Sequence, residues 1–359
     1  MVPLLNKFKL TRFRINTILI TIIYISVLLL IQHRRFLADD KAPNLQKIDE
    51  KTQKLASKVH VGMYVNSFPI FSFDSGDFTI DATVWFRFPA ATEALSTIEH
   101  FTLYNGLIQQ NGKLLYRSTP IIKLVGEDVV ACYHIQTSFK LDMNYKFFPI
   151  GDHTLHILLE NRSATAQELC FISDEDSFLL SRNVLIKNWF AKKKTVQSGY
   201  IQSNLDSKDN TSEISYPAVL FSIDFENVGM KKIGGLYLPM FILFLIGLLS
   251  LLLAIGDSLR LEMIVGALPS LGLFRLVIDG ASPNTGYAMH VDIVFYTFIF
   301  LLLIIMGFQL YVTLTLDNIK HMAEDAQDNV KIRLAKMSDI VFVLTLFLLM
   351  VLLTYSFYK

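Results

Sequence analysis

The sequence predicts an integral membrane protein in which an all-β sandwich is followed by a four-helix transmembrane bundle, with an extra transmembrane helix at the N-terminus. Three observations predict this fold class. The chain of 359 residues is 52% hydrophobic and only 18% charged, which is too apolar for a soluble enzyme of this length. Long apolar runs occur near the N-terminus and throughout the last third. Between them, short runs alternate apolar and polar residues, as strands do.

The first apolar run, residues 15–32, is long enough to cross a hydrocarbon core of ~30 Å as a helix. No small-residue cleavage site stands clearly after it, which favours a retained membrane anchor over a signal peptide. Four basic residues precede the run and two follow it, so residues 1–14 are predicted to be cytoplasmic. Residues 33–58 are polar and are expected to form a partly helical linker.

Residues 59–232 are predicted to form the β-sandwich, on the extracellular or periplasmic side of the membrane. Apolar residues alternate with smaller or polar ones from Phe78 to Phe88, and the cluster Asp74-Ser75-Gly76-Asp77 before them is typical of a hairpin turn. Further strand-like runs are Val129 to Lys140, His153 to Glu160 and Ala218 to Phe225. Several such runs with intervening turns favour two packed sheets of the immunoglobulin-like kind.

The two cysteines, Cys132 and Cys170, both fall in this β-rich segment. An oxidising compartment would permit a disulfide between them. The sequence leaves a bridge and two free thiols equally open.

Residues 233–359 contain four apolar runs that fit membrane helices. A charged stretch, residues 316–338, separates the third run from the fourth and carries several cations, so it is predicted to be a cytoplasmic loop. With a cytoplasmic N-terminus this topology closes consistently in a plasma membrane or bacterial inner membrane. The four runs are Leu236 to Ile255, Met263 to Ile278, Val291 to Thr313 and Ile340 to Tyr358.

Several function classes find no support in the sequence. The net charge of +1 gives no field that would attract nucleic acid. The histidines show no metal-ligand spacing, and there is neither a glycine-rich phosphate loop nor a GxSxG nucleophile motif. We therefore expect no enzyme, no metal and no cofactor.

Two strings in the β-rich segment are distinctive. HVGMYVNSF, with FDSGDFTIDATVWFRF after it, gives a strand pair whose second strand is rich in aromatic residues. SFKLDMNYKFFPIGDHTLHILLEN places the pair Phe148-Pro149 in a loop between two strands. Both strings resemble the pentameric ligand-gated ion channels of the Cys-loop receptor superfamily, with Phe148-Pro149 in the signature loop. The positions of the two loop cysteines are Leu141 and Leu155 here, so the namesake disulfide is absent, as in prokaryotic members.

A third string agrees in spacing as well. Pro239 lies in LYLPMFILFL as the proline of the family's first membrane helix does, and ALPSLGLFRLVIDGASPNTGY is similar to the pore-lining helix and the turn after it. No gap is needed between Pro239 and Pro283. The resemblance covers about Val59 to Leu310, and it departs from the family at Gly151, where an acid usually stands; Asp152 follows one place later.

The resemblance implies a homopentamer gated by a small-molecule ligand or by protons, in contact with membrane lipid and permeant ions. Helical spacing then predicts which residues of the second bundle helix face the pore. A ring of Glu262 carboxylates would favour cations, and apolar rings further along would gate by dewetting. Pro269 stands where the family usually carries its gate leucine, so an altered or bent pore is expected. The predicted pore-lining residues are Glu262, Gly266, Pro269, Leu273, Leu276, Val277 and Gly280.

The family binds ligands in aromatic pockets, because a π-face attracts cationic amines. Most aromatic residues in a sandwich are core residues, so each candidate is weighed against that simpler role. The ligand-contact candidates are Trp85, Phe86, Phe171, Phe178, Tyr200 and Tyr216. The residues expected to couple ligand binding to gating are Phe148, Pro149, Asp152, Lys231, Lys232 and Pro283, with the two lysines at the end of the last strand.

Two further features leave alternatives open. Arg275 is expected to pair with Asp279 one turn later or with Asp292 on the next helix, or else all three lie wet at the membrane interface. Pro269, Gly151 and the extra anchor also suit a second function class, a non-conducting membrane receptor or scaffold that keeps the channel fold.

Overall fold

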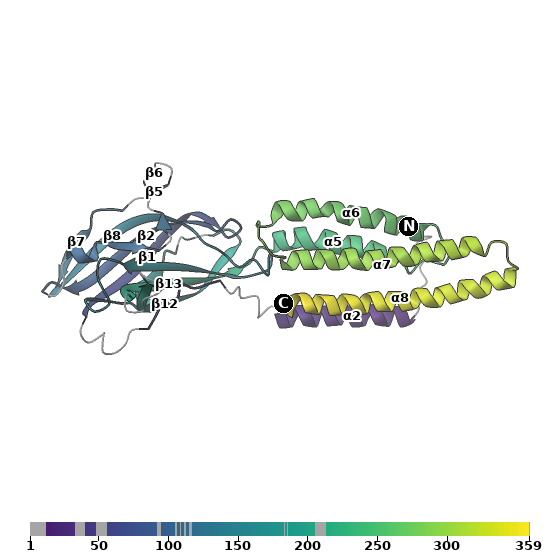
Figure 1. Cartoon of the computed structure of the whole chain (residues 1–359), viewed down its shortest axis with the longest axis horizontal. Helices are drawn as coiled ribbons and strands as arrows, with labels where there is room; N and C mark the ends of the chain where they lie inside the picture. Colours follow the sequence, from purple (N-terminus) through teal and green to yellow (C-terminus); the bar gives the residue numbers. More distant parts are fainter. Residues whose placement is uncertain are drawn as a thin grey trace. The chain divides into compact units, whose positions relative to one another are not determined.

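The computed structural model divides into two compact units (Figure 1). Unit 1 comprises residues 1–37, 145–151 and 229–359, and unit 2 comprises residues 38–144 and 152–228. The residues that the structure describes are 12–32, 40–47, 56–91, 95–104, 106–107, 109–110, 113–114, 117–182, 184, 186–204 and 213–358.

Unit 2 is built on two sheets. The first has the order β10-β1-β2-β8-β4, with β11 also pairing with β1 and β7 with β8. Its strands are β1 (Ser57–Ser72), β2 (Asp77–Pro89), β4 (Gly106–Leu107), β7 (Ile121–Val125), β8 (Asp128–Lys140), β10 (Leu169–Ile172) and β11 (Phe178–Leu180). β10 and β11 run parallel to β1, and the other pairings in this sheet are antiparallel.

The second sheet has the order β12-β13-β9-β3. Its strands are β12 (Trp189–Asn204), β13 (Glu213–Asn227), β9 (His153–Asn161) and β3 (Phe101–Leu103). A small separate hairpin joins β5 (Gln109–Gln110) to β6 (Lys113–Leu114), and the short helices are α4 (Leu95–Ile98) and the 3₁₀ turn η1 (Glu175–Ser177).

The two sheets pack through aromatic side chains on their inner faces. Phe178 of β11 lies 5.0 Å from Phe221 of β13 between ring centroids, and Phe71 of β1 lies 5.1 Å from Phe225. The predicted alternation is confirmed on β2, where every second residue from Phe78 to Phe88 is buried. The hairpin turn before β2 is also confirmed, with Gly76 at φ 69°. Burial of one side-chain face per strand is therefore what forms this core.

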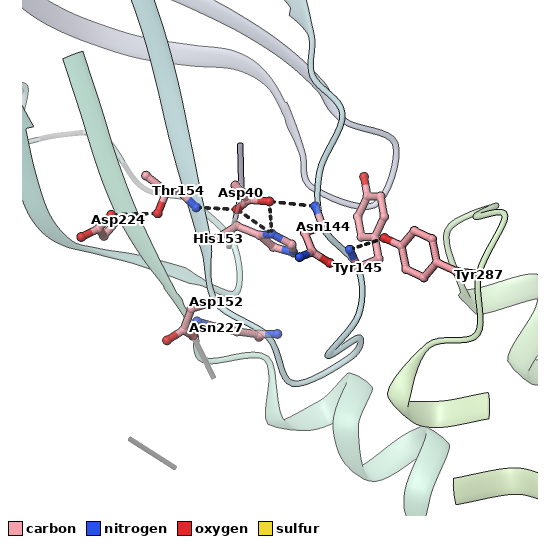
Figure 2. A network of polar contacts seen from close by, with 9 residues as sticks. All are labelled: Asp40, Asn144, Tyr145, Asp152, His153, Thr154, Asp224, Asn227 and Tyr287. Atoms are coloured by element: carbon pink, nitrogen blue, oxygen red, sulfur yellow. Dashed lines mark hydrogen bonds and ion pairs between the residues drawn. The ribbon is translucent and has the colours of Figure 1, made fainter. Parts of the chain in front are cut away.

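The segment Asp40–Lys47, which we name the strap, lies against the second sheet. Gln46 and Tyr200 exchange two backbone hydrogen bonds of 2.8 and 2.9 Å, and Leu45 packs on an apolar cluster that includes Leu158 and Leu220. Figure 2 shows how the Asp40 carboxylate is held: it accepts hydrogen bonds from the backbone N–H groups of Asn144 and Thr154, both at 2.8 Å, and lies 3.1 Å from His153 Nδ1.

The linker predicted over residues 33–58 was expected to be partly helical, and most of it lies outside the described residues. Its described part, residues 40–47, is not helical and is pinned to a sheet. Of the remaining linker residues, 56–58 are described and already lead into β1, and the others lie outside the described residues. The predicted cytoplasmic segment 1–14 is described only from residue 12.

Unit 1 is a bundle of long helices. They are α2 (Arg12–Gln32), α5 (Met230–Ser250), α6 (Leu259–Ala281), α7 (His290–Asn318) and α8 (Glu324–Tyr358). Among the described residues, α5 to α8 are each long and apolar enough to cross a membrane, and α2 adds a shorter apolar stretch, Phe13–Leu28. A β-rich region followed by four such helices makes the chain a membrane protein, as predicted.

Two boundaries differ from the prediction. The charged stretch 316–338 is not a loop, because α7 continues to Asn318 and α8 already begins at Glu324. Its alanines and well-spaced charges suit a helix as well as a loop, so composition alone did not separate the two. The sandwich ends at Asn227 rather than at residue 232, since Lys231 and Lys232 lie in the first turn of α5.

The two cysteines are both free thiols. Cys170 lies on β10 and Cys132 on β8, with β1 and β2 between them in the same sheet. Three strand spacings separate the two residues by at least about 14 Å, well beyond the reach of a disulfide. Burial raises the pKa of the Cys170 thiol, which further reduces its reactivity.

Candidate pore face and coupling loop

Helix α6 has one face buried in unit 1 and the opposite face uncovered. The buried side chains are Arg260, Ile264, Ala267, Leu271 and Ile278. At about 100° per residue these positions fall on one side of the helix, and residues spaced by three or four from Glu262 fall on the other. The chain itself therefore leaves the Glu262 side of α6 without a partner among its described residues.

The residues predicted to line a pore all lie on this uncovered face. The exposed fractions of Leu273, Leu276 and Val277 are 68%, 72% and 51%. Around Gly266 and Gly280 no atom stands within 4 Å of the position that a Cβ would take. The complete predicted set is exposed: Glu262, Gly266, Pro269, Leu273, Leu276, Val277 and Gly280.

The composition of this face differs from that of the exposed face of α2. On α2 the exposed side chains are mostly large and apolar, and they include Phe13, Ile20 and Ile23 at 58%, 61% and 61% exposure. On α6 the uncovered face mixes leucines and two valines with glycines, a proline, a serine and two acids. Small and polar residues gain little from contact with acyl chains, so this face fits water or another protein surface better than lipid.

Pro269 does not interrupt α6, which runs from Leu259 to Ala281 as one helix. Proline removes one backbone donor there, and the Ser270 hydroxyl one residue on donates to the Gly266 carbonyl at 2.8 Å. The side chains of Pro269 and Ser270 are both exposed. A bent pore at this position stays a prediction.

Arg275 ties α6 to α7. Its Nη1 donates to the Asp292 carboxylate at 2.5 Å, and its Nη2 lies 2.8 Å from Asp279 Oδ1, so both of the alternative partners are used. Asp292 is 4% exposed, and its second oxygen accepts the backbone N–H of Met289 at 2.8 Å, which caps the start of α7. The guanidinium also lies over the Phe295 and Tyr296 rings.

The loop that contains Phe148-Pro149 belongs to unit 1. The residue 145–151 segment is held there by three backbone contacts: the Tyr145 N–H donates to the Tyr287 hydroxyl, the His290 N–H to the Lys146 carbonyl, and the Val291 N–H to the Phe148 carbonyl. The first of these is drawn in Figure 2. Phe148 is 7% exposed and packs in the core of the helix bundle, with the Lys232 ammonium 4.5 Å from its ring centroid.

The other predicted coupling residues are distributed more widely. Lys231 is exposed in the first turn of α5, and Pro283 is buried just after α6. Asp152 belongs to unit 2, where its carboxylate accepts the backbone N–H of Asn227 at 2.9 Å at the end of β13. Burial raises the pKa of Asp152, although that hydrogen bond acts in the opposite direction.

Four of the six ligand-contact candidates are core residues of unit 2. Phe86, Phe171 and Phe178 are 0% exposed and Tyr200 is 5% exposed, so they offer almost no surface to a ligand. Trp85 and Tyr216 are half-buried, and their role stays a prediction. The alternation places each of these residues on one face of its strand, but it does not say which face is the interior. Phe86, Phe171, Phe178 and Tyr200 face the interior, in agreement with the simpler core role.

Unit 2 contains a cavity of about 440 Å³ that the sequence did not predict. Strap residues, Leu141 to Met143 and outward-facing residues of β9 and β12 line it, and none of the six aromatic candidates does. His156 in its wall contacts the Ser222 hydroxyl at 2.8 Å, and burial lowers the pKa of this histidine, which leaves it neutral near pH 7. The available signal was Gly199, since a glycine inside a strand often marks a close approach of another segment.

The described residues contain no group of three or more His, Cys, Asp or Glu side chains placed to hold a metal ion. A scan of the chain against models of known protein families finds no match. A search of the curated proteins finds no match either.

Proposed function

We propose that this chain is a subunit of a homopentameric, cation-permeable channel of the Cys-loop receptor type, gated by a small-molecule ligand or by protons. The observation that carries the proposal is the uncovered face of α6. It begins at an exposed acid, Glu262, and continues through the glycines, Pro269 and three large apolar residues that helical spacing predicts for a pore.

Copies of α6 around a shared axis would give this face a place that suits its composition. Five Glu262 carboxylates would form an acidic ring at the cytoplasmic end, and rings of acidic side chains select cations. Leu273, Leu276 and Val277 would form apolar rings, which gate by excluding water. Between these rings, the glycines and Pro269 contribute only small side chains to the pore lining.

The two units have separate roles in this proposal. The immunoglobulin-like sandwich of unit 2 senses the ligand outside the cell or in the periplasm, and unit 1 conducts. The 145–151 segment supports coupling, because it joins β8 to β9 in the chain and yet is held by α7 and by Lys232. The N-terminus is cytoplasmic in a multi-pass topology, and the membrane is a plasma or bacterial inner membrane.

A non-conducting receptor or scaffold with the same fold is the second candidate. Pro269 favours it, because the residue stands at the position of the usual gate leucine and offers less apolar bulk to a ring. Gly151 favours it as well, because the coupling loop then lacks an acid in the usual register.

Cation flux into liposomes separates the two candidates. The purified chain should conduct K⁺, and native mass spectrometry should find five copies. E262Q should lower the permeability of K⁺ relative to Cl⁻ by roughly fivefold, since one unit charge about 4 Å from an ion in water is worth about 1 kcal/mol. E324Q removes the same charge from the exposed start of α8 and should leave the ratio unchanged. A monomer, or a pentamer without flux under any ligand or pH, would refute the channel.

A further inference from the structure

Helix α2 is an integral part of unit 1 rather than a detached anchor. It runs alongside α8, as Figure 1 shows. Near its start, Arg14 Nε lies 2.5 Å from Asp339 Oδ1, and further along the Tyr24 hydroxyl is 2.5 Å from the Thr354 hydroxyl. The Arg14 side chain is only 7% exposed, so it reaches into the bundle and away from lipid.

The buried Arg14 side chain reaches the turn between α5 and α6, residues 251–258. Helix α5 ends at Ser250, and the carbonyls at the end of a helix have no partner within it. Three successive carbonyls here each accept a hydrogen bond from a different helix: Leu251 from Ser338 of α8 at 3.1 Å, Leu252 from Arg14 of α2 at 3.4 Å, and Leu253 from Arg260 of α6 at 3.3 Å.

Two cations at this position match the partial negative charge of a helix C-terminus. They also lie in a connected polar network. Arg260 Nε donates to Gln309 of α7 at 3.0 Å, its Nη2 donates to Ser338 at 3.0 Å, and Gln309 Nε2 donates to the Ser250 hydroxyl at 3.1 Å. Arg260, Gln309, Ser338 and Ser250 are all buried, so the loss of one member would leave its partners unsatisfied away from water.

This network sits directly before the proposed pore face. Arg260 is two residues from Glu262 and points to the opposite side of the same helix. The position of the first turn of α6, and with it the position of Glu262, is therefore set by what holds the 251–258 turn.

We propose that Arg14 is a positioning residue for the pore entrance: through Leu252 and Asp339 it latches the 251–258 turn to α8 and so places the Glu262 end of α6. This inference rests on the proposed function for its effect on conduction, and the latch itself does not. The extra N-terminal helix is then a control element, because a change in the packing of α2 on α8 is transmitted to the entrance.

Hydrogen exchange followed by mass spectrometry tests the latch in the full chain reconstituted in nanodiscs. The backbone N–H groups of Leu251 and Leu252 donate to the Leu248 and Leu249 carbonyls in the last turn of α5, and that of Asp257 donates to the Ala254 carbonyl inside the turn. Their exchange therefore reports the opening of the turn and of its junction with α5. R14A should raise exchange in 251–258 by at least about tenfold, because a hydrogen bond from a charged donor is lost. R14K keeps the charge and should restore part of the protection. N16A, at an exposed position on the same turn of α2, should change nothing.

The cation flux per reconstituted protein, compared between R14A and N16A, tests the pore role, and we expect it to change in R14A alone. If R14A does not fold, D339N removes the carboxylate partner and keeps Arg14, and it should loosen the same turn to a smaller degree. Unchanged exchange in the turn, or a rise spread evenly over α5 to α8, would overturn the latch. A loosened turn with flux equal to that of N16A would overturn the pore role, and no flux from the wild type would refute the proposed function and with it that role.

Discussion

Replacing Gly199 of β12 with alanine should release the strap from unit 2. A Cβ at this position would lie 2.3 Å from the Gln46 carbonyl oxygen and 2.7 Å from Leu45 Cγ. The carbonyl is backbone, so relief requires the strap to move away from the sheet as a segment.

The size of the effect follows from what the strap would lose. Its two backbone hydrogen bonds with Tyr200 are worth about 1 kcal/mol each. Half-buried Leu45 adds about 1 kcal/mol of apolar burial. Glycine to alanine in a strand would otherwise stabilise by about 0.5 kcal/mol. The net destabilisation of strap docking is about 2 to 3 kcal/mol, which corresponds to a roughly fiftyfold rise in strap opening.

Hydrogen exchange of peptides covering residues 40–47 measures this opening in the full chain. Gln197→Ala is the matched control, because Gln197 is exposed on the same face of β12 and is two residues from Gly199. The strap amides should exchange much faster in Gly199→Ala and as in the wild type in Gln197→Ala. Equal or greater protection in Gly199→Ala would show that the strap does not depend on this close contact.

The remaining predictions concern α7 and the strap. Asp292→Ala should destabilise unit 1 by about 2 kcal/mol, because α7 loses its cap and part-exposed Arg275 keeps only Asp279 as a carboxylate partner. A thermal melt in detergent should show a clearly lower melting temperature for this variant. Asp279→Ala is the control and should melt close to wild type, because the Asp279 side chain is 53% exposed. Burial lowers the pKa of His156 below 6.5, so unit 2 binds fewer protons with the strap docked than with the strap released. His156 faces Asp40 and Asp224, and the protection of residues 40–47 from hydrogen exchange that depends on its neutral form should be complete above pH 6.5 and decline below it. His156→Gln should flatten this decline. A pH profile that is unchanged in His156→Gln would exclude His156 as the cause.

Local patterns predicted the strands and most of the membrane helices. The alternation from Phe78 to Phe88 became β2, and the Val129 to Lys140 run became β8 with one residue added. The boundary between Thr313 and Ile340 was the weakest point, because a charged segment with helix-forming residues reads equally as a loop or as the exposed start of a helix.

The face of α6 was also predictable, since one turn per 3.6 residues is enough to sort a helix into two sides. The helical period does not say which of the two sides the bundle covers. Ile264, Ala267 and Leu271 are no more apolar than Leu273 and Leu276, and only their contacts in the bundle show that the first three are buried. The same limit applies to the aromatic candidates, because Phe86 and Trp85 are neighbours on a strand and only the packing of the sheets shows which one is interior.

The sequence by itself determined that the chain lies in a membrane and that a strand-rich segment precedes four long helices. Both properties depend on the length and period of apolar runs, because each backbone polar group in a run must be satisfied by the run itself or by a neighbouring strand. Only the tertiary structure decided that α2 packs on α8, that Arg14 reaches the Leu252 carbonyl and that Asp40 is held by β9. Those contacts join residues 100 or more positions apart, and no local period encodes which distant partner a side chain meets.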